Sequence, residues 1–245
     1  ADTLLNRSQM YRNIFDHSKK WFRPRKANGD WVSWPKDGML HEFYGCMECN
    51  PLQQGWFVPH DLPGLIELVG GKENILKKLE DFFSKTPKDL LWNSFYNHAN
   101  EPVHHVPFLF NRLGKPWLTQ YWARFICNNA YFNSVEGLVG NEDAGQMSAW
   151  YVFASSGLYP ICPGDNRYEI SSPIFSEILF EVPATNKIFT IKVHNNSVEN
   201  MYIQSAKLNG MNYNKCYLMH EDILNGSTLE LFMGDKPNKK WGLIP

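Results

Sequence analysis

The chain has 245 residues, of which 43% are hydrophobic and 20% are charged, and its formal net charge at pH 7 is −1. A charge so close to zero excludes the basic footprint of a nucleic-acid-binding protein and a polybasic membrane patch. The composition is that of a folded chain, and no run of 18 apolar residues is present that could cross a membrane.

Aromatic residues are abundant, since 16 Phe, 11 Tyr and 9 Trp make up 15% of the chain. Most of them are expected in the core, although flat rings also stack on sugar faces. Five cysteines are too few and too scattered for a disulfide scaffold. The first residues carry no signal-peptide pattern. Three Asn-X-Ser triplets, at Asn6, Asn195 and Asn225, permit glycosylation only in a secreted protein, so the compartment stays open.

The first two-thirds of the chain is predicted to be mainly α-helical. Asp61-Leu62-Pro63 is a helix start signal and Gly70-Gly71 a stop signal, and the next segment alternates apolar and charged faces at helical spacing. The expected helices span residues 4–15, 61–69, 72–84, 103–113, 117–130 and 145–156. Long polar loops at 23–60 and 92–102 separate them, and such loops often carry function.

After about residue 165 the pattern changes to short β-branched runs separated by turn signals such as Asn209-Gly210. The expected strands span residues 168–170, 178–182, 188–193, 202–208 and 229–232. We therefore predict two parts, a helical part at 1–164 and an antiparallel β-rich tail at 165–245.

The first polar cluster lies at residues 41–61 and combines carboxyl groups with aromatic rings. Its members are Glu42, Tyr44, Glu48, Trp56, His60 and Asp61. Apolar neighbours favour the protonated form of a carboxyl group, so Glu48, beside Met47 and Cys49 and near Trp56, is a candidate general acid. An exposed loop acid or a helix cap is the alternative.

The second cluster is Asn141-Glu142-Asp143, which follows Gly140 and precedes a predicted helix. Three consecutive oxygen-bearing side chains can activate water or bind a hard cation. The alternative is an ordinary capped helix start.

The third cluster crowds nine residues at 97–105 and comprises His98, Asn100, Glu101, His104 and His105. The HExxH pattern of zinc enzymes is absent, and oxygen ligands from Asn100 and Glu101 suit calcium better than zinc. Structural histidines are the alternative.

Cys46-Met47-Glu48-Cys49 is a single CxxC pair with no second pair elsewhere. A zinc site would need further ligands, and a thioredoxin-like role would need a βαβ context. A redox or metal function through these cysteines is therefore the third-ranked hypothesis.

At these clusters the sequence resembles the C-terminal part of the glycoside hydrolase family 92 α-mannosidases. The motifs that carry the resemblance are long and run through the whole chain. They include YRNIFD at 11–16, FRPR at 22–25, GWFVPHDLPGLIELVGG at 55–71, NEPVHH at 100–105, GNEDAGQMSAWYVFASSGLYPICPG at 140–164 and MGDKPNKKWG at 233–242.

The resemblance implies an inverting, calcium-dependent exo-α-mannosidase whose catalytic domain is an (α/α)6 toroid, behind an N-terminal β-sandwich. It implies that Glu48 is the general acid, that Asp143 is the general base with Asn141 beside it, and that Asn100 and Glu101 lie near Ca2+. The side chains expected to contact substrate are Trp56, His60, Asp61, His104, His105 and Glu142.

The sequence departs from the family pattern near the predicted acid. Cys49 stands where many relatives have Gly, residues 51–54 replace an aromatic-rich run, and Ala144 replaces a frequent Cys. The β-sandwich and the first toroid helices have no counterpart in these 245 residues. We therefore expect the chain to need these parts as partners and to leave an apolar patch exposed where they would pack.

The function predicted is hydrolysis of α-mannosides of glycans, of α-1,2 type, outside the cytoplasm, with a mannose-containing glycan as partner and no nucleic acid. The alternative is a non-catalytic mannose-binding remnant, because part of a toroid does not close an active site by itself.

Overall fold

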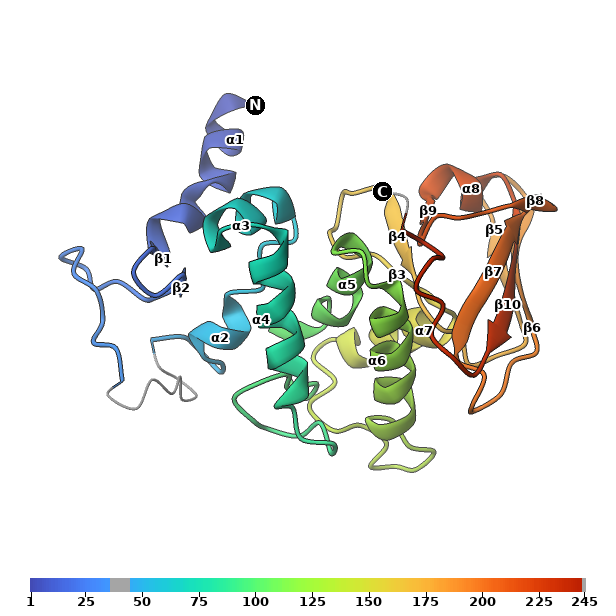
Figure 1. Cartoon of the computed structure of the whole chain (residues 1–245), viewed down its shortest axis with the longest axis horizontal. Coiled ribbons are helices and arrows are strands. Elements are labelled where there is room, and N and C mark those ends of the chain that lie inside the picture. The colour runs from blue at the N-terminus through green and yellow to red at the C-terminus, as the bar shows by residue number, and fades with distance from the viewer. Residues whose placement is uncertain (36–44, 244–245) are drawn as a thin grey trace. The chain divides into compact units, whose positions relative to one another are not determined.

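The computed structural model describes residues 1–35 and 45–243, and Figure 1 shows the course of the chain. Glu42 and Tyr44 of the first cluster lie outside these described residues. The chain forms two compact units, the first made of Ala1–His104 with Val139–Asn141 and the second of His105–Leu138 with Glu142–Pro245. The change from helices to strands falls near residue 158, whereas the compact units divide at His104.

The first unit is built from short helices and one small hairpin. Its elements are α1 (Asp2–Ser8), η1 (Met10–Ile14), β1 (Phe15–Asp16), β2 (Trp21–Phe22), α2 (Pro51–Gln54), α3 (Leu62–Val69), α4 (Lys72–Ser84) and η2 (Glu101–Val103). Helix α3 begins at the predicted cap and ends at Gly70, whose φ of 92° needs the freedom of glycine. The predicted helix over 4–15 is wrong in its second half, where the chain tightens into the 3-10 helix η1.

The core of the first unit is aromatic. The ring centroids of Trp21 and Trp56 lie 4.9 Å apart, and Phe82 packs against Trp56 at 5.8 Å. Phe83 stacks on Tyr96 at 4.9 Å. The amphipathic pattern of α4 therefore points Phe82 and Phe83 inward as predicted, and many of the aromatic residues have their ordinary role in packing.

Helix α1 carries two exposed apolar side chains among polar ones. The helix has no buried residue, and Leu4 and Leu5 are 70% and 65% exposed. The apolar patch expected where the β-sandwich and the first toroid helices would pack stays a prediction. Trp92, on the loop before the third cluster, is also half exposed.

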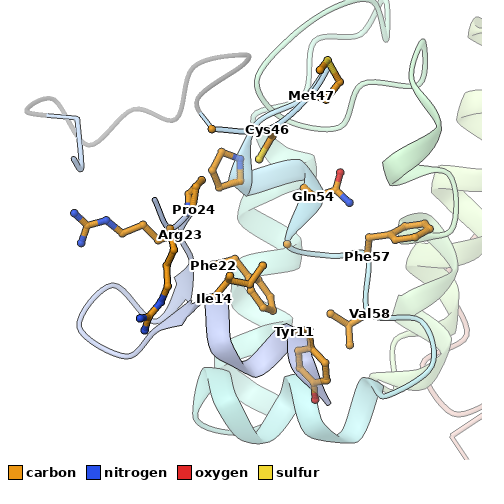
Figure 2. Close-up of a pocket in the computed structure, with 14 residues that line it drawn as sticks. Tyr11, Ile14, Phe22, Arg23, Pro24, Cys46, Met47, Gln54, Phe57 and Val58 are labelled. Carbon is orange, nitrogen blue, oxygen red and sulfur yellow. The ribbon is translucent and has the colours of Figure 1, made fainter. Parts of the chain in front are cut away.

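A hollow of about 460 Å³ opens in the first unit among Tyr11, Phe22, Arg23, Cys46 and Val58 (Figure 2). It brings strand β2 beside the segment that precedes α2, which places Cys46 and Met47 on its wall. Among the described residues no helix is long and apolar enough to span a membrane.

The second unit joins short and long helices to two sheets. Its elements are η3 (Val106–Phe108), α5 (Leu109–Arg112), α6 (Pro116–Asn129), α7 (Gln146–Ser155), β3 (Leu158–Tyr159), β4 (Arg167–Ile170), β5 (Glu177–Val182), β6 (Lys187–His194), β7 (Tyr202–Leu208), β8 (Met211–Asn212), β9 (Tyr217–Met219), α8 (His220–Leu224) and β10 (Thr228–Gly234). The single helix predicted over 103–113 is wrong, because Pro102 and Pro107 lack the N–H that a continuous helix requires.

The sheets confirm most of the predicted strands and correct their pairing. The larger sheet has the order β5-β6-β10-β7-β8, and the smaller has the order β3-β4-β9. Strand β10 lies parallel to β6, so the larger sheet is mixed and not purely antiparallel. Alternating side chains of its strands, such as Phe189, Ile191, Leu229 and Leu231, are buried in one apolar core. The (α/α)6 toroid expected of the family stays a prediction.

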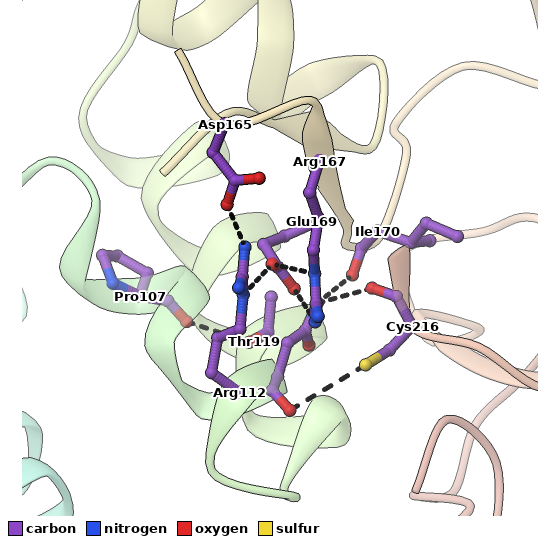
Figure 3. A network of polar contacts seen from close by, with 9 residues as sticks. Pro107, Arg112, Thr119, Asp165, Arg167, Glu169, Ile170 and Cys216 are labelled. Atoms are coloured by element: carbon purple, nitrogen blue, oxygen red, sulfur yellow. Dashed lines mark hydrogen bonds and ion pairs between the residues drawn. The ribbon is translucent and has the colours of Figure 1, made fainter. Parts of the chain in front are cut away.

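A buried ion network holds the short strand β4 to helix α5 (Figure 3). The carboxylate of Glu169 is fully buried and pairs with both Arg112 and Arg167. Arg112 also reaches Asp165, at 3.0 Å. Next to it, the buried amide of Asn111 donates to the carbonyls of Ile170 and Cys216, at 2.9 Å each. These bonds tie α5 to both β4 and the segment before β9.

We expect Glu169→Gln to lower the free energy of unfolding by about 3 kcal/mol, because it removes the buried counter-charge shared by Arg112 and Arg167 and leaves Arg112 with Asp165 alone. Urea unfolding of the native protein measures this. Glu177→Gln, on the exposed face of β5, is the matched control and should change stability by less than about 0.5 kcal/mol. Equal effects of the two substitutions would contradict the role given to Glu169.

Candidate active site

A small hollow of about 230 Å³ in the first unit brings Glu48 together with Asn100 and Glu101. These residues come from two of the three clusters that the sequence singled out. The lining consists of Met47, Glu48, Gln54, Phe57, Asn100, Glu101 and Pro102. A carboxyl group, an amide and a second carboxyl group therefore share one solvent-accessible depression.

Three side-chain amides fasten the Glu48 segment to the loop at 93–100. The buried Asn50 caps helix α2 by accepting from Gln53 N at 2.9 Å, and its Nδ2 donates to Ser94 O at 3.1 Å. The side chain of Gln53 donates to the carbonyls of Asn93 and Phe95, at 2.7 Å each. The third amide, of Asn100, donates to the backbone carbonyl of Glu48.

The backbone at Glu48 is held in an uncommon conformation. Its φ is 53°, in the left-handed region that residues other than glycine and asparagine rarely adopt. The side chain is exposed, so the apolar enclosure expected around the carboxyl group is not provided by the described residues. Met47 is 83% exposed, and it is Phe57, not Trp56, that shares the hollow with Glu48.

Trp56 is a core residue, which corrects its predicted contact with substrate. Only 1% of it is exposed, and it packs edge-on against Trp21. The sequence contains a signal that shows which of the two neighbouring aromatic residues, Trp56 and Phe57, faces inward. Asn50 and Gln53 form a capping box that starts α2 with Pro51 at its first position, and this short helix turns Trp56 inward and leaves Phe57 half exposed.

His60 and Asp61 also serve the fold and not the hollow. Asp61 caps α3 through Gly64 N at 2.9 Å, and it accepts from the hydroxyl of Tyr11 at 2.7 Å. Burial opposes ionisation of Asp61, but hydrogen bonds from Tyr11, Gln9 and Gly64 outweigh it and lower its pKa. Burial and the same bond raise the pKa of Tyr11 to about 12. His60 bonds the carbonyl of Ser8, at 2.9 Å.

The histidines of the third cluster are buried. His98 has no exposed surface and bonds the hydroxyl of Tyr96 at 2.8 Å, and its ring centroid lies 4.7 Å from that of His104. Burial, and then the charge of His104, lower the pKa of His98 well below its usual value, so this ring is neutral. His104 bonds the carbonyl of His98 at 3.0 Å and is 1% exposed, and His105 is 4% exposed. Both histidines lie in the interior and not at the surface predicted for substrate contact.

The described residues do not support the zinc hypothesis. They contain no group of three or more His, Cys, Asp and Glu side chains that could hold a metal ion. Asn100 and Glu101 offer oxygen donors beside Glu48, and such donors suit a hard cation such as calcium. They could supply two of the six to eight oxygens that calcium takes.

The second cluster begins in the first unit and continues into helix α7. A Cβ on Gly140 would lie 2.5 Å from the carbonyl oxygen of Ala99, so only glycine allows the chain to pass next to the Asn100 loop. Asn141, the next residue, is exposed. Glu142 accepts from Ser148 N at 3.0 Å and from its hydroxyl at 2.8 Å, so it fixes the start of α7, and its predicted contact with substrate stays a prediction.

Asp143 shares the backbone conformation of Glu48. Its φ is 46°, and Ala144 and Gly145 follow with φ of 57° and 89°, so three successive residues are left-handed before α7. The side chain of Asp143 is exposed. Of the eight described residues other than glycine that have positive φ, two are the two predicted catalytic carboxylates. Strained backbone of this kind is concentrated at functional sites.

A family model described as "Glycosyl hydrolase family 92 catalytic domain" matches residues 1–235. The chain belongs to glycoside hydrolase family 92. An "Uncharacterized secreted glycosidase" of Arthroderma benhamiae is 36% identical over an alignment that covers 91% of this chain and 29% of that protein.

Solved structures agree with this assignment. The family GH92 alpha-mannosidase BT3965 from Bacteroides thetaiotaomicron is 36% identical and superposes with a TM-score of 0.88, over 98% of this chain and 31% of that one. A second structure of BT3965, in complex with mannoimidazole, has a TM-score of 0.85 at 35% identity, over 98% and 33% of the two chains. The inverting mannosidase BT2199 from the same organism is 31% identical with a TM-score of 0.88, over 100% and 35%. The chain spans about a third of the length of these relatives.

We expect Asn50→Ala to lower the free energy of unfolding by about 2 kcal/mol, because it removes the α2 cap and leaves Ser94 O without this donor. Thermal unfolding followed by tryptophan fluorescence reports it, since Trp56 lies directly after α2. Asn74→Ala, which removes an exposed bond to Gly70 O, is the control. A loss no larger than that of the control would contradict the role of the amides.

Proposed function

We propose that this chain carries both catalytic carboxylates of an inverting exo-α-mannosidase that acts on glycans. Family membership and the alpha-mannosidase and inverting-mannosidase neighbours support the reaction class. The mannoimidazole complex of a neighbour supports a mannose-like group as the ligand. The secreted relative supports an extracytoplasmic location, and the preference for α-1,2 linkages is part of the same proposal.

The observation that carries the proposal is the hollow in which Glu48 meets Asn100 and Glu101. Glu48 is exposed there on a left-handed backbone, with its carbonyl held by Asn100. Asp143 is exposed on a backbone of the same kind. Both carboxyl groups can therefore reach a ligand, whereas Asp61 and Glu142 are engaged by backbone N–H groups.

In this mechanism Glu48 donates its proton to the glycosidic oxygen as the leaving group departs. Asp143, as a carboxylate, takes a proton from the water that attacks the anomeric carbon on the opposite face. Inverting enzymes place the two carboxyl groups about 6.5–9.5 Å apart so that this water fits between them. Asn100 positions the acid by its bond to Glu48 O, and Asn141 stands two residues before the base.

Calcium is the proposed cofactor, with Asn100 Oδ1 and the carboxylate of Glu101 as its protein ligands in this chain. When bound, it would supply positive charge that orients vicinal sugar hydroxyls. Sugar hydroxyls and water would complete the coordination. The proximity of these oxygen donors to Glu48 in the hollow supports this assignment.

We expect Glu48→Gln and Asp143→Asn each to lower kcat by about 10²–10⁴-fold on an aryl α-mannoside, because each removes one proton transfer. Neither should lower the unfolding temperature, since both side chains are exposed. Steady-state kinetics of the native protein measure the effect. The controls are Glu73→Gln, in the first turn of α4, and the exposed Asp235→Asn, which should keep full activity.

The anomer of mannose that is released first shows whether the reaction proceeds with inversion. Proton NMR of the early reaction should show β-mannose, as inversion of an α-mannoside requires. Release of α-mannose would overturn the inverting assignment. Binding of mannose without hydrolysis, unchanged by either carboxylate substitution, would favour the alternative of a non-catalytic glycan-binding protein.

Chelation should lower activity, and calcium should restore it. We expect EDTA to reduce kcat/KM by at least about tenfold, with recovery on Ca2+ and not on Zn2+, because the donors are oxygens. Glu101→Gln should raise the calcium concentration needed for half-maximal activity. Full activity after exhaustive chelation would remove calcium from the proposal.

A further inference from the structure

The predicted acid Glu48 lies in the sequence between two cysteines that are not joined in a disulfide. Cys46 and Cys49 enclose Met47 and Glu48, and the two cysteine side chains are hydrogen-bonded to each other. Close approach of the two sulfur atoms is the condition for joining them without large backbone movement. The proposed mechanism does not use either thiol.

The two thiols differ in accessibility. Cys49 is 1% exposed, and its Sγ donates to Gln54 Oε1 at 3.2 Å. Cys46 is partly exposed and lines the 460 Å³ hollow, near Met47 and Gln54 in Figure 2. The hydrogen bond between the two cysteine side chains lowers the pKa of Cys46 against the opposing effect of burial. An accessible thiol with a buried partner is the usual arrangement of an attacking and a resolving cysteine.

The segment Cys46–Cys49, which carries the two thiols, contributes residues to both hollows. Met47, Gln54 and Phe57 line both hollows, whereas Cys46 lines only the larger and Glu48 only the smaller. A covalent change at Cys46 would therefore act on the segment that presents Glu48.

We propose that Cys46 and Cys49 form a modification site, where exchange with a low-molecular-weight disulfide closes an intramolecular disulfide around Glu48 and moves that carboxyl group out of its catalytic position. The disulfide itself follows from the thiol geometry, and its effect on activity rests on the proposed function.

The exchange balances as two successive substitutions. The Cys46 thiolate attacks one sulfur of the disulfide R–S–S–R, which forms a mixed disulfide and releases one RS−. The Cys49 sulfur, after losing its proton, attacks Cys46 Sγ and releases the second RS−. The two cysteine protons end on the two released thiols, so the protein loses two electrons and R–S–S–R gains them.

Formation of the disulfide must move the end of the segment that carries Cys46. The S–S bond is about 2.05 Å long, which is shorter than any hydrogen-bonded sulfur separation. Cys49 is followed directly by Asn50, which is fixed to Gln53 and Ser94. The Cys49 bond to Gln54 is lost, and the residues from Cys46 to Glu48 adjust. A displacement of about 1 Å in a catalytic group can cost 10²-fold in rate.

The test treats the native protein with oxidised glutathione and then with dithiothreitol. Trypsin releases both cysteines in one peptide, residues 37–72, because no Lys or Arg lies between Lys36 and Lys72. Oxidation should remove two hydrogen masses from this peptide and lower kcat by at least about tenfold, and reduction should reverse both changes. Cys46→Ser should abolish both responses. Cys162→Ser, which removes another partly exposed thiol, should leave them intact.

The mass of the peptide shows whether the disulfide has formed, and this measurement does not require enzymatic activity. Absence of the mass change, or glutathione that stays attached to Cys46, overturns the modification site and leaves the proposed function standing. A closed disulfide with unchanged kcat overturns the effect on Glu48. If no α-mannoside is hydrolysed in either state, the proposed function is wrong and the peptide mass alone decides the inference.

Discussion

The position of Glu48 depends on three side-chain amides that join two loops far apart in the sequence. Helix α2 has four residues, too few to be stable without tertiary bonds. Asn50 and Gln53 give it a capping box at one end and fasten it to the loop at 93–100, and Asn100 returns a bond from that loop to Glu48. Asn50 and Gln53 do not line the hollow, yet they fix its geometry, so the acid depends on residues that never meet a ligand.

Local signals predicted the elements of the fold better than their partners. Helix α4 spans exactly the residues at which its amphipathic pattern begins and ends, and α3 lies between its cap and Gly70. The parallel pairing of β10 with β6 could not be predicted, because alternation shows which face of a strand is buried and not which strand lies beside it. The break in the helix predicted over 103–113 could have been predicted from Pro102 and Pro107, because a proline limits a helix even where the apolar residues recur at helical spacing.

Residue chemistry alone does not show which bonds a polar side chain already makes within the chain. Asp61, Glu142 and His104 are the kinds of residue that bind sugars, but each is occupied by a bond within the chain, to Gly64 N, Ser148 N and His98 O. The sequence cannot show that a backbone group lies within reach of a polar side chain. The family resemblance implied that Glu48, Asn100 and Glu101 lie near one sugar, and the structure brings these three residues into one hollow.

The backbone at Glu48 and Asp143 is the strongest structural reason to connect them with chemistry. A left-handed conformation costs a residue with a Cβ about 1 kcal/mol or more, and glycine would avoid this cost. Of the other six described residues of this kind, three are asparagines, at Asn186, Asn195 and Asn209, and the rest are Lys20, Leu90 and Ala144. Glu48 and Asp143 stand where glycine would cost less free energy. Local hydrogen bonds offset the strain: Asn100 bonds the backbone of Glu48, and Glu142 bonds Ser148 at the start of α7. Glycine cannot transfer a proton, and a sharp loop presents a carboxyl group clear of the surrounding backbone, so the strain is explained if both carboxylates act on a ligand.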